Sequence, residues 1–317
     1  MRLVLAAILA FLPLAAGAQA FPSKPIRIIV PFTPGSATDT MARPIAEKLS
    51  AALGQQVLVE NRPGAGGTIG ASLVAKAPPD GYTLGVVSTG HVVNPVLYSS
   101  LPYDTLKDFS GVSPLAGQPS VLVVSPSLGV KTVKDLVAMA KAKPGQLNYA
   151  TAGVGSAAHI SAEKFRMAAG IDAVHVPFKG SPESITETMG GRTQYTWTPL
   201  STAVGQIRSG QLLALAVSTA QRSHTLPDVP TIAEAGFPRG VFNFWVGMLA
   251  PANTPREILA RLNTEVQRAL QAADMKERLA TLGSEPMAMS PEQFDAFLRE
   301  EFTVLGEVMR ASGVKAQ

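Results

Sequence analysis

Short apolar segments alternate with glycine-containing turns and amphipathic stretches along most of this chain. Residues 26–32 (IRIIVPF) are apolar and β-branched over a short length, which is typical of a buried strand. Residues 33–38 form a turn, and residues 41–53 then place apolar side chains at helical spacing up to Gly54, a residue type that commonly ends helices. The same order repeats from residues 56–60 onward. Strands separated by helices predict parallel β-α-β units and therefore an α/β fold.

The alternation restarts at residues 121–124, and helical stretches follow late in the chain, over residues 255–311. That helix-rich end must pack against an earlier part, because amphipathic helices bury one face. We therefore predict a two-lobed α/β fold joined by two crossovers that form a hinge. The first lobe would comprise residues 21–120 plus 226–317, and the second lobe residues 121–225. A chain of two consecutive domains is the alternative.

The first 20 residues have the organisation of a secretory signal peptide. Arg2 provides positive charge, residues 3–16 are largely apolar, and Ala18-Gln19-Ala20 is a small-x-small cleavage site. A membrane anchor is the alternative, but the apolar run is shorter than the about 20 residues that a span needs. We predict cleavage after Ala20 and export to the periplasm, which leaves 297 of the 317 residues, enough for two domains.

The composition excludes several classes of protein. The chain has no Cys, so it carries no disulfide framework, no thiolate metal site and no Cys for a lipid anchor. Its net charge is +4, and its Lys and Arg residues are scattered without a basic run, so no nucleic-acid partner is expected. A slightly basic protein with few charged residues is compatible with a small anionic ligand.

The first strand-to-helix turn is a candidate anion site. A helix start leaves backbone N–H groups unpaired and carries partial positive charge. Gly35 allows close approach of a ligand, and Ser36 and Thr38 offer hydroxyl groups. An ordinary helix cap after a Pro-Gly turn is the alternative, which this motif alone favours, and Asp39 fits a first-turn carboxylate that stabilises the helix. The candidates from this turn are Phe32, Pro34, Gly35, Ser36, Ala37, Thr38 and Asp39.

A second turn of the same kind strengthens the interpretation as a binding site. Residues 151–156 (TAGVGS) again join a strand to a helix, with Ser156 as the cap. Because such turns lie at the carboxyl ends of parallel strands, one turn per lobe can face the other across a cleft. A third turn, at Lys179 and Gly180, adds the positive charge of Lys179 and another helix start. The candidates from these two turns are Thr151, Ala152, Gly153, Gly155, Ser156, Lys179 and Gly180.

Single side chains near these turns are further candidates, each with a structural role in the core as the alternative. His91 follows a predicted strand, and His159 lies one turn into a predicted helix. The four His residues lack the spacing of a metal site, so no metal is expected. The aromatic residues at strand ends can face a ligand or fill the core. These candidates are Thr89, His91, His159, Trp197, Thr198 and Phe244.

The sequence contains partial matches to nucleotide-binding and catalytic motifs, but none is complete. Residues 64–70 (GAGGTIG) resemble a dinucleotide loop with the third Gly one position late, and no phosphate-binding P-loop occurs. Ser161 and Lys164 match an acyl-enzyme pattern, but they lie in the middle of a predicted helix. An exported hydrolase using Ser156 or Ser161 with a histidine is the competing hypothesis. No set of acid, base and nucleophile supports it, so we expect neither catalysis nor a cofactor.

An ordered string of motifs covers almost all of the chain after the expected export signal. The motifs are residues 24–32 (KPIRIIVPF), 59–67 (VENRPGAGG), 79–84 (PDGYTL), 101–104 (LPYD), 147–153 (LNYATAG), 174–180 (VHVPFKG) and 226–231 (LPDVPT). Together they resemble the Bug family, the periplasmic receptors of tripartite tricarboxylate transporters.

The resemblance implies a type II Venus-flytrap fold, no catalysis, and binding of a small carboxylate by the two Gly/Ser turns. It also implies delivery of that carboxylate to the membrane permease of a tripartite tricarboxylate transporter. The same fold serving as a ligand sensor for a two-component kinase is the alternative. We expect a monomer.

Two departures from the family pattern bear on the ligand. Gly35-Ser36 stands where relatives often have Gly-Gly, which adds a hydroxyl group. After Gly190-Gly191, relatives carry Val-Asp-x-x-Phe-Asp, whereas this chain has residues 193–198 (TQYTWT) and both acidic positions are neutral. Loss of the second acid, to Thr198, disfavours a ligand with an ammonium group. We therefore hypothesise a di- or tricarboxylate or an aromatic acid rather than an amino acid.

Overall fold

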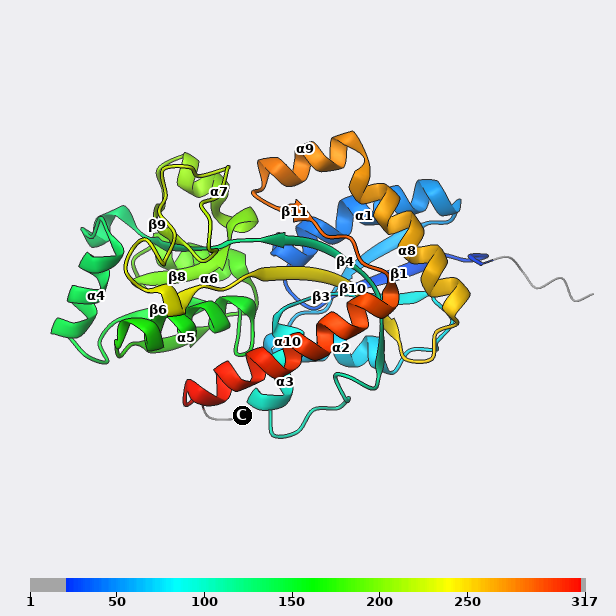
Figure 1. Cartoon of the computed structure of the whole chain (residues 1–317), viewed down its shortest axis with the longest axis horizontal. Coiled ribbons are helices and arrows are strands. Elements are labelled where there is room, and N and C mark those ends of the chain that lie inside the picture. Colours follow the sequence, from blue (N-terminus) through cyan, green and yellow to red (C-terminus); the bar gives the residue numbers. More distant parts are fainter. Residues whose placement is uncertain (1–20, 315–317) are drawn as a thin grey trace, which may run out of the picture.

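The computed structural model describes residues 21–314, and the expected signal peptide lies outside them. Two α/β lobes lie side by side, and each has its own sheet (Figure 1). The predicted two-lobed α/β fold with crossovers is confirmed. Within the described residues, no helix is long and apolar enough to cross a membrane.

The sheet of the first lobe is parallel on one side and antiparallel on the other. Its strands are β1 (Ile26–Val30), β2 (Val57–Asn61), β3 (Thr83–Ser88), β4 (Phe109–Gln118), β10 (Phe244–Pro251) and β11 (Glu285–Pro286). They lie in the order β11-β4-β10-β3-β1-β2. β1 pairs in parallel with β2 and β3, as the sequence pattern predicted, whereas β10 runs antiparallel to both β3 and β4.

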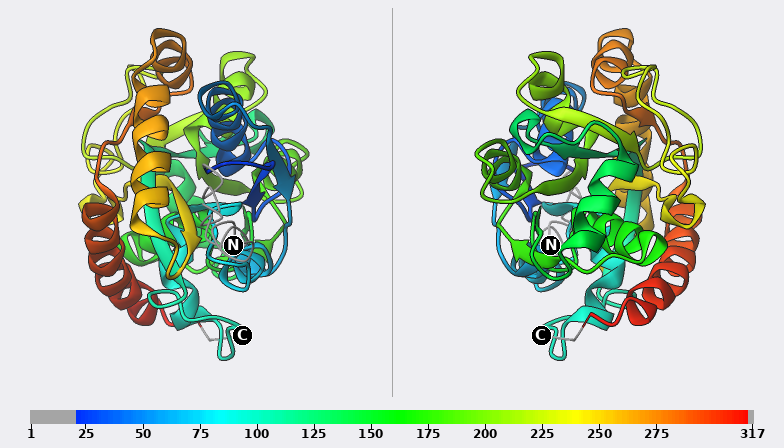
Figure 2. Two further views of the ribbon diagram at one scale, coloured as in Figure 1. Left: turned by 90° about the vertical axis from the view of Figure 1, so that its right-hand side faces the viewer. Right: turned by 90° about the vertical axis from the view of Figure 1, so that its left-hand side faces the viewer.

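Helices cover both faces of this first sheet. They are α1 (Ala37–Leu53), α2 (Thr68–Ala75), α3 (Gly90–Leu97), α8 (Arg256–Gln271), α9 (Ala273–Thr281) and α10 (Pro291–Ala311), with a short 3₁₀ turn η1 (Ala65–Gly67). α1 packs against α8, and α3 packs against α2 and α10. In the end-on views, α8, α9 and α10 lie together along one side of the molecule, in orange to red (Figure 2). The late helices therefore return to the first lobe, as their amphipathic pattern predicted.

The sheet of the second lobe repeats this arrangement. Its strands are β5 (Ser120–Val124), β6 (Asn148–Thr151), β7 (Val174–Pro177), β8 (Tyr195–Pro199) and β9 (Leu213–Val217), in the order β7-β6-β8-β5-β9. Its helices are α4 (Val133–Ala142), α5 (Ala157–Ala169), α6 (Ser181–Met189) and α7 (Leu200–Arg208), with 3₁₀ turns η2 (Pro126–Leu128) and η3 (Pro238–Gly240).

β5 shows how two cores form on opposite faces of the second sheet. Because side chains alternate along a strand, Leu122 and Val124 face one side and Val121 and Val123 the other. The first pair packs in a core with α4 and α5, and the second pair packs with α6 and α7. All four side chains are fully buried.

Two crossings join the lobes, and Ser218 ties them together. Only Pro119 separates β4 from β5, so the first crossing is nearly continuous. The Ser218 hydroxyl accepts the N–H of Ser120 at 2.9 Å and donates to the carbonyl of Phe242 at 2.7 Å. Residues on both crossings are thus held to one side chain, which fixes the position of the hinge.

Residues 226–241 pack on the second lobe, whereas Phe242 belongs to the core of the first lobe. Ile232 is fully buried in the core beneath α5, and Phe237 lies edge to face with Phe165 at 5.9 Å between ring centroids. The lobe limits at residues 120 and 226 stay predictions about domain division. From this packing we propose that the second crossing falls at residues 242–244.

Candidate functional site

A cavity of about 20 Å³ lies between the two lobes, and we call it the interlobe cavity. It has room for about one water molecule, so its lining residues must shift to hold a larger organic anion. Its lining residues are Phe32, Ser36, Ala37, Thr38 and Ser88 of the first lobe, Phe244 at the hinge, and Ala152, Ser156, Ala157, Ala158, Ser181 and Pro199 of the second lobe. None of these side chains carries a charge.

Helix starts from both lobes meet at the interlobe cavity. α1 and α5, which are 17 and 13 residues long, each place their N-cap serine and first residue on its wall. α6 contributes its first residue, Ser181, and Pro199 directly precedes α7. The first N–H groups of a helix lack intrahelical acceptors and carry partial positive charge. These helix starts therefore provide a positive potential without Lys or Arg, which suits an anion.

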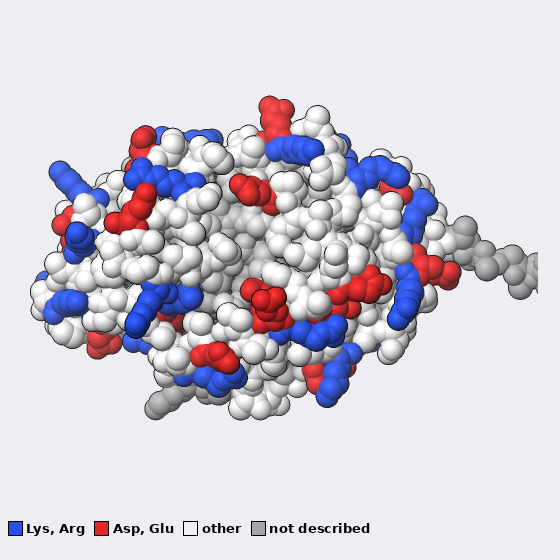
Figure 3. Space-filling view, in the orientation of Figure 1, with Lys and Arg blue, Asp and Glu red and all other residues white. Residues whose placement is uncertain are grey.

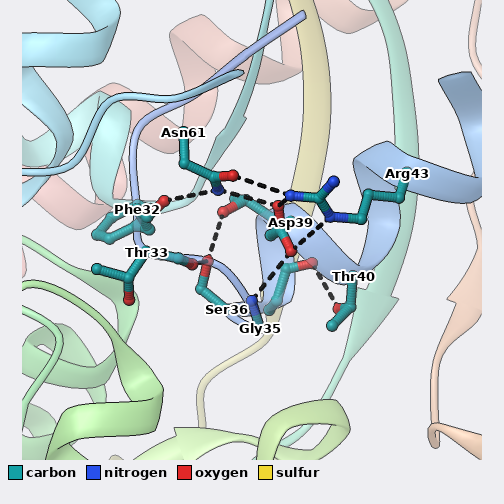
Figure 4. A network of polar contacts seen from close by, with 10 residues as sticks. Phe32, Thr33, Gly35, Ser36, Asp39, Thr40, Arg43 and Asn61 are labelled. Carbon is teal, nitrogen blue, oxygen red and sulfur yellow. Dashed lines mark hydrogen bonds and ion pairs between the residues drawn. The ribbon is translucent and has the colours of Figure 1, made fainter. Parts of the chain in front are cut away.

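The turn before α1 leaves its helix start free of a side-chain cap. Gly35 has a φ of 81°, a left-handed conformation that suits glycine. The Ser36 hydroxyl donates to the carbonyl of Thr33 at 2.7 Å and makes no capping bond to an N–H of α1 (Figure 4). The N–H groups at this end of α1 are therefore available to a ligand.

Asp39 is used to fix this turn and does not line the cavity. Its carboxylate accepts bonds from Arg43, from the N–H of Gly35 at 3.0 Å and from the Asn61 amide at 2.9 Å (Figure 4). Burial alone would raise the pKa of Asp39, but these bonds and the Arg43 charge outweigh burial and lower the pKa. The carboxylate stays ionised and is balanced by Arg43, so it does not oppose an anion at the helix start.

The turn before α5 is held by a histidine. The Ser156 hydroxyl caps α5 by accepting the N–H of His159 at 3.3 Å, and His159 Nδ1 accepts the N–H of Gly155 at 3.2 Å. His159 stacks on His175 with 4.2 Å between ring centroids. Burial lowers the pKa of His159 to about 4, so the ring is neutral near pH 7 and Nδ1 is free to accept. His159 thus holds the turn in place without lining the cavity.

The two lobes touch directly beside the cavity. Tyr98 donates its hydroxyl to the carbonyl of Val154 at 3.0 Å, and Thr33 donates to Glu183 at 3.1 Å. A methyl group on Gly66 would lie 1.8 Å from the Val154 carbonyl oxygen, so backbone approaches backbone across the lobe interface. The structure is therefore a closed arrangement of the lobes.

The structure brings part of the predicted site together. The candidates that line the cavity are Phe32, Ser36, Ala37, Thr38, Ala152, Ser156 and Phe244. The candidates that do not line it are Pro34, Gly35, Asp39, Thr89, His91, Thr151, Gly153, Gly155, His159, Lys179, Gly180, Trp197 and Thr198. Within residues 21–314, no group of three or more His, Asp or Glu side chains could hold a metal ion.

Two aromatic candidates belong to the cores. Trp197 is fully buried and lies 5.8 Å from Phe165 between ring centroids in the second lobe. His91 lies edge to face with Phe109 at 4.7 Å and stacks on Tyr103, and neither of its ring nitrogens has a partner. Burial lowers the pKa of His91 to about 4. Both side chains take the structural role that the sequence left as the alternative.

Three further candidates also point elsewhere. Thr89 is fully buried and its hydroxyl accepts the N–H of Trp245 at 3.0 Å, which joins α3 to β10. Thr198 shares a hydrogen bond of 2.8 Å with Thr202 on α7. Lys179 is exposed to solvent. The third turn therefore contributes a helix start to the site and no cation.

The sequence analysis missed five lining residues, which are Ser88, Ala157, Ala158, Ser181 and Pro199. Four of them sit in the first turn of a helix or directly before it, next to a candidate that was named. Helix N-termini bind ligands through N–H groups of the first turn, so the residues after each cap were the signal. Ser88, the last residue of β3, marks the carboxyl end of a third parallel strand.

Two sheets of matching strand order, hinged around a cavity formed by helix starts, define a two-lobed solute-binding protein. The family model of the tripartite tricarboxylate transporter family receptor matches residues 41–314, so the chain belongs to this family. It is a periplasmic-type transport receptor and not an enzyme. Protein BugT of Bordetella pertussis is 38% identical over 300 residues, which cover 94% of this chain and 92% of BugT. The resemblance seen in the motifs is confirmed.

Solved structures of the same fold include proteins with bound acids. A protein of R. palustris with adipate has a TM-score of 0.90 and 36% identity, covering 94% of this chain and 100% of that chain. MatC from Rhodopseudomonas palustris with bound malate has a TM-score of 0.86 and 34% identity, covering 91% of this chain and 99% of that chain.

Proposed function

We propose that this chain is exported to the periplasm, binds a small di- or tricarboxylate or an aromatic acid in the interlobe cavity, and delivers it to the permease of a tripartite tricarboxylate transporter. One observation carries the proposal: helix starts of both lobes converge on a cavity that, among the described residues, no charged side chain lines. Backbone N–H groups and serine hydroxyls then hold the carboxylate, and closure removes it from water.

A ligand with two carboxylates fits the division of the site between the lobes. α1 presents its start from the first lobe, whereas α5 and α6 present theirs from the second. One acidic group can therefore be held by each lobe, and the ligand joins the lobes. The relatives solved with adipate and with malate support this, because both acids carry two carboxylates.

The cavity also argues against an amino-acid ligand. A desolvated ammonium group needs a charged or hydrogen-bonding acceptor. Within residues 21–314, no Asp or Glu lines the interlobe cavity, and Asp39, the acid nearest to a lining residue in sequence, is paired with Arg43 at 2.8 Å. The lack of an acid among the described lining residues supports a purely anionic ligand.

The test is a binding screen with the purified protein, using thermal shift and calorimetry. The panel contains adipate, malate, citrate, benzoate, aspartate and glutamate, because a ligand of the folded form raises the melting temperature. We expect one or more acids without an amine to bind. Binding of aspartate or glutamate, with no binding of the other acids, would contradict the proposal.

Two variants of one lining residue provide a matched pair. Thr38→Asp and Thr38→Asn have side chains of nearly equal size in the first turn of α1, and differ in charge. Like-charge repulsion in a site screened from water should weaken binding of the acid at least about tenfold in the Asp variant relative to the Asn variant. Equal binding by the two variants would place the acid elsewhere.

The cellular part of the proposal has its own measurements. N-terminal sequencing of the protein from a periplasmic fraction should begin at Phe21, and gel filtration should give a monomer. Deleting the gene for the permease should abolish uptake of the acid that the screen identifies. Uptake that survives loss of the permease would refute the delivery step while leaving binding intact.

A further inference from the structure

A second cavity, of about 750 Å³, lies against the hinge strands and shares Phe244 with the interlobe cavity. We call it the hinge cavity. Its walls are the ends of β4 and β10, residues 219–225 after β9, α9, β11 and two residues of α10. The face shown in Figure 3 is hollowed at its centre, over β4 and β10, with acidic side chains at the edge of the hollow. Its volume is within the range of small-molecule sites.

Glu301 is the half-buried charge of the hinge cavity. Its carboxylate accepts a hydrogen bond from the indole N–H of Trp245 at 2.8 Å. Burial raises the pKa of Glu301, and the bond from Trp245 opposes this rise. Within residues 21–314, Glu301 belongs to no ion pair. Its charge is therefore open to a cationic partner.

The lining side chains of Arg222 and Lys276 form no ion pair with Glu301. Arg222 is paired with Glu234 at 2.9 Å, and Lys276 is exposed on α9. Glu285 on β11 adds a second acid to the wall. A half-buried charge is screened less by salt than exposed charges are. We therefore expect Glu301 to make the cavity favour a positively charged ligand.

Two buried polar atoms in the wall have no partner. Gln118 is 5% exposed and its amide nitrogen lacks an acceptor, although its amide oxygen accepts the N–H of Ser201. Ser284 is 3% exposed and its hydroxyl has no partner. Both atoms are closed off from solvent, so a ligand in the cavity does not reach them in this structure. Phe297 and Trp245 supply aromatic wall.

We propose that the hinge cavity is a second binding site, for a small organic cation with an aromatic body. The ammonium group binds at Glu301 and the ring lies against Phe297. Apart from the shared Phe244, the residues of this site differ from those proposed to hold the acid, so the proposal does not rest on the identity of that acid. Both lobes form it, because Thr225 donates its hydroxyl to the carbonyl of Ala280 on α9 at 3.1 Å.

The experiment measures binding of tyramine to the whole protein by calorimetry, with tyrosol as the neutral analogue. Tyramine carries the ring, the hydroxyl and the ammonium group, whereas tyrosol has an alcohol in place of the amine. Glu301→Gln keeps an acceptor for Trp245 and removes the charge. Glu307→Gln is the matched control, since Glu307 is exposed on the same helix and does not line the cavity.

We expect saturable binding of tyramine, weaker binding of tyrosol, and a loss of about tenfold or more in tyramine affinity with Glu301→Gln, as for one charged hydrogen bond. Glu307→Gln and Thr38→Asp should leave tyramine binding unchanged. The proposal is overturned if tyramine does not bind at millimolar concentration, if tyrosol binds equally well, or if Glu301→Gln has no effect. Thr38→Asp is expected to weaken binding of the acid and not binding of tyramine. The two binding measurements therefore test the two sites separately.

Discussion

Gly90→Ala should prevent full closure of the lobes while leaving each lobe folded. Gly90 begins α3 in the first lobe, and a methyl group there would lie 2.3 Å from the carbonyl oxygen of Gly155 in the second lobe. Its next nearest atoms also belong to residues 155–156. The backbone of Gly90 is not left-handed, so alanine is compatible with the open form and slightly favours the helix.

The size of the effect follows from these distances. Real contacts of this kind are not shorter than 3.0 Å, so the atoms must separate by at least about 0.7 Å. The bond from Tyr98, which follows α3, to Val154 would lengthen from 3.0 Å beyond the hydrogen-bond range. Overpacking of this kind costs about 1–3 kcal/mol. If the closed form binds the acid, affinity falls by about five- to 150-fold.

The measurement is calorimetric titration with the acid that the screen identifies, beside urea unfolding of the protein without ligand. Gly205→Ala is the matched control, because Gly205 lies in α7, is not left-handed, and has no atom within 4 Å of the added methyl group. We expect the control to bind like the unmodified protein. Equal affinity of both variants would refute the claim that this closed arrangement is the binding form.

Two further predictions concern the cap of α5 and the response to acid. Ser156→Ala should lower the free energy of unfolding by about 1 kcal/mol in urea and also weaken binding of the acid, because Ser156 both caps α5 and lines the cavity. Thr132→Ala removes the cap of α4, which does not line the cavity. This variant should lower the free energy of unfolding by a similar amount and leave the affinity for the acid unchanged. His91→Phe should raise stability and flatten its loss in acid, as followed by urea unfolding at several pH values. The unfolded histidine takes up a proton near pH 6.5, whereas burial lowers the folded pKa to about 4, so stability is complete above pH 6.5 and falls toward pH 4. An unchanged pH slope would exclude His91 as a source of this loss.

The helices and strands with local signals at both ends were predictable from sequence. α5 begins at Ala157, directly after the predicted cap Ser156, and ends at Ala169, before Gly170 with a φ of 59°. β4 was missed, because Gly111, Pro114 and Gly117 interrupt any strand pattern within it. This strand depends on β10, with which it pairs across two irregularities in register. Such long-range pairing leaves no local signal in the sequence.

The site was predictable to the extent that it is made of backbone. Both Gly/Ser turns were found because a turn between a strand and a helix is a local feature of the chain. Side-chain direction was not predictable where it depends on distant packing. Trp197 faces the core because its strand pairs with β5, where Leu122 lies opposite it. Thr89 faces β10 because Trp245, 156 residues later, supplies the N–H that it accepts.

The strand order explains why binding can be converted into motion. β2-β1-β3-β10-β4 in the first sheet matches β7-β6-β8-β5-β9 in the second, so β10 and β5 occupy the same place. Each of these strands enters its sheet from a crossing, β5 through Pro119 and β10 through residues 242–243. Because both crossings continue into paired strands and are held to Ser218, bending is confined to a few residues and each lobe moves as a unit. The helix starts that we propose as the acid site are fixed to these lobes, so a ligand that joins them should stabilise the closed form.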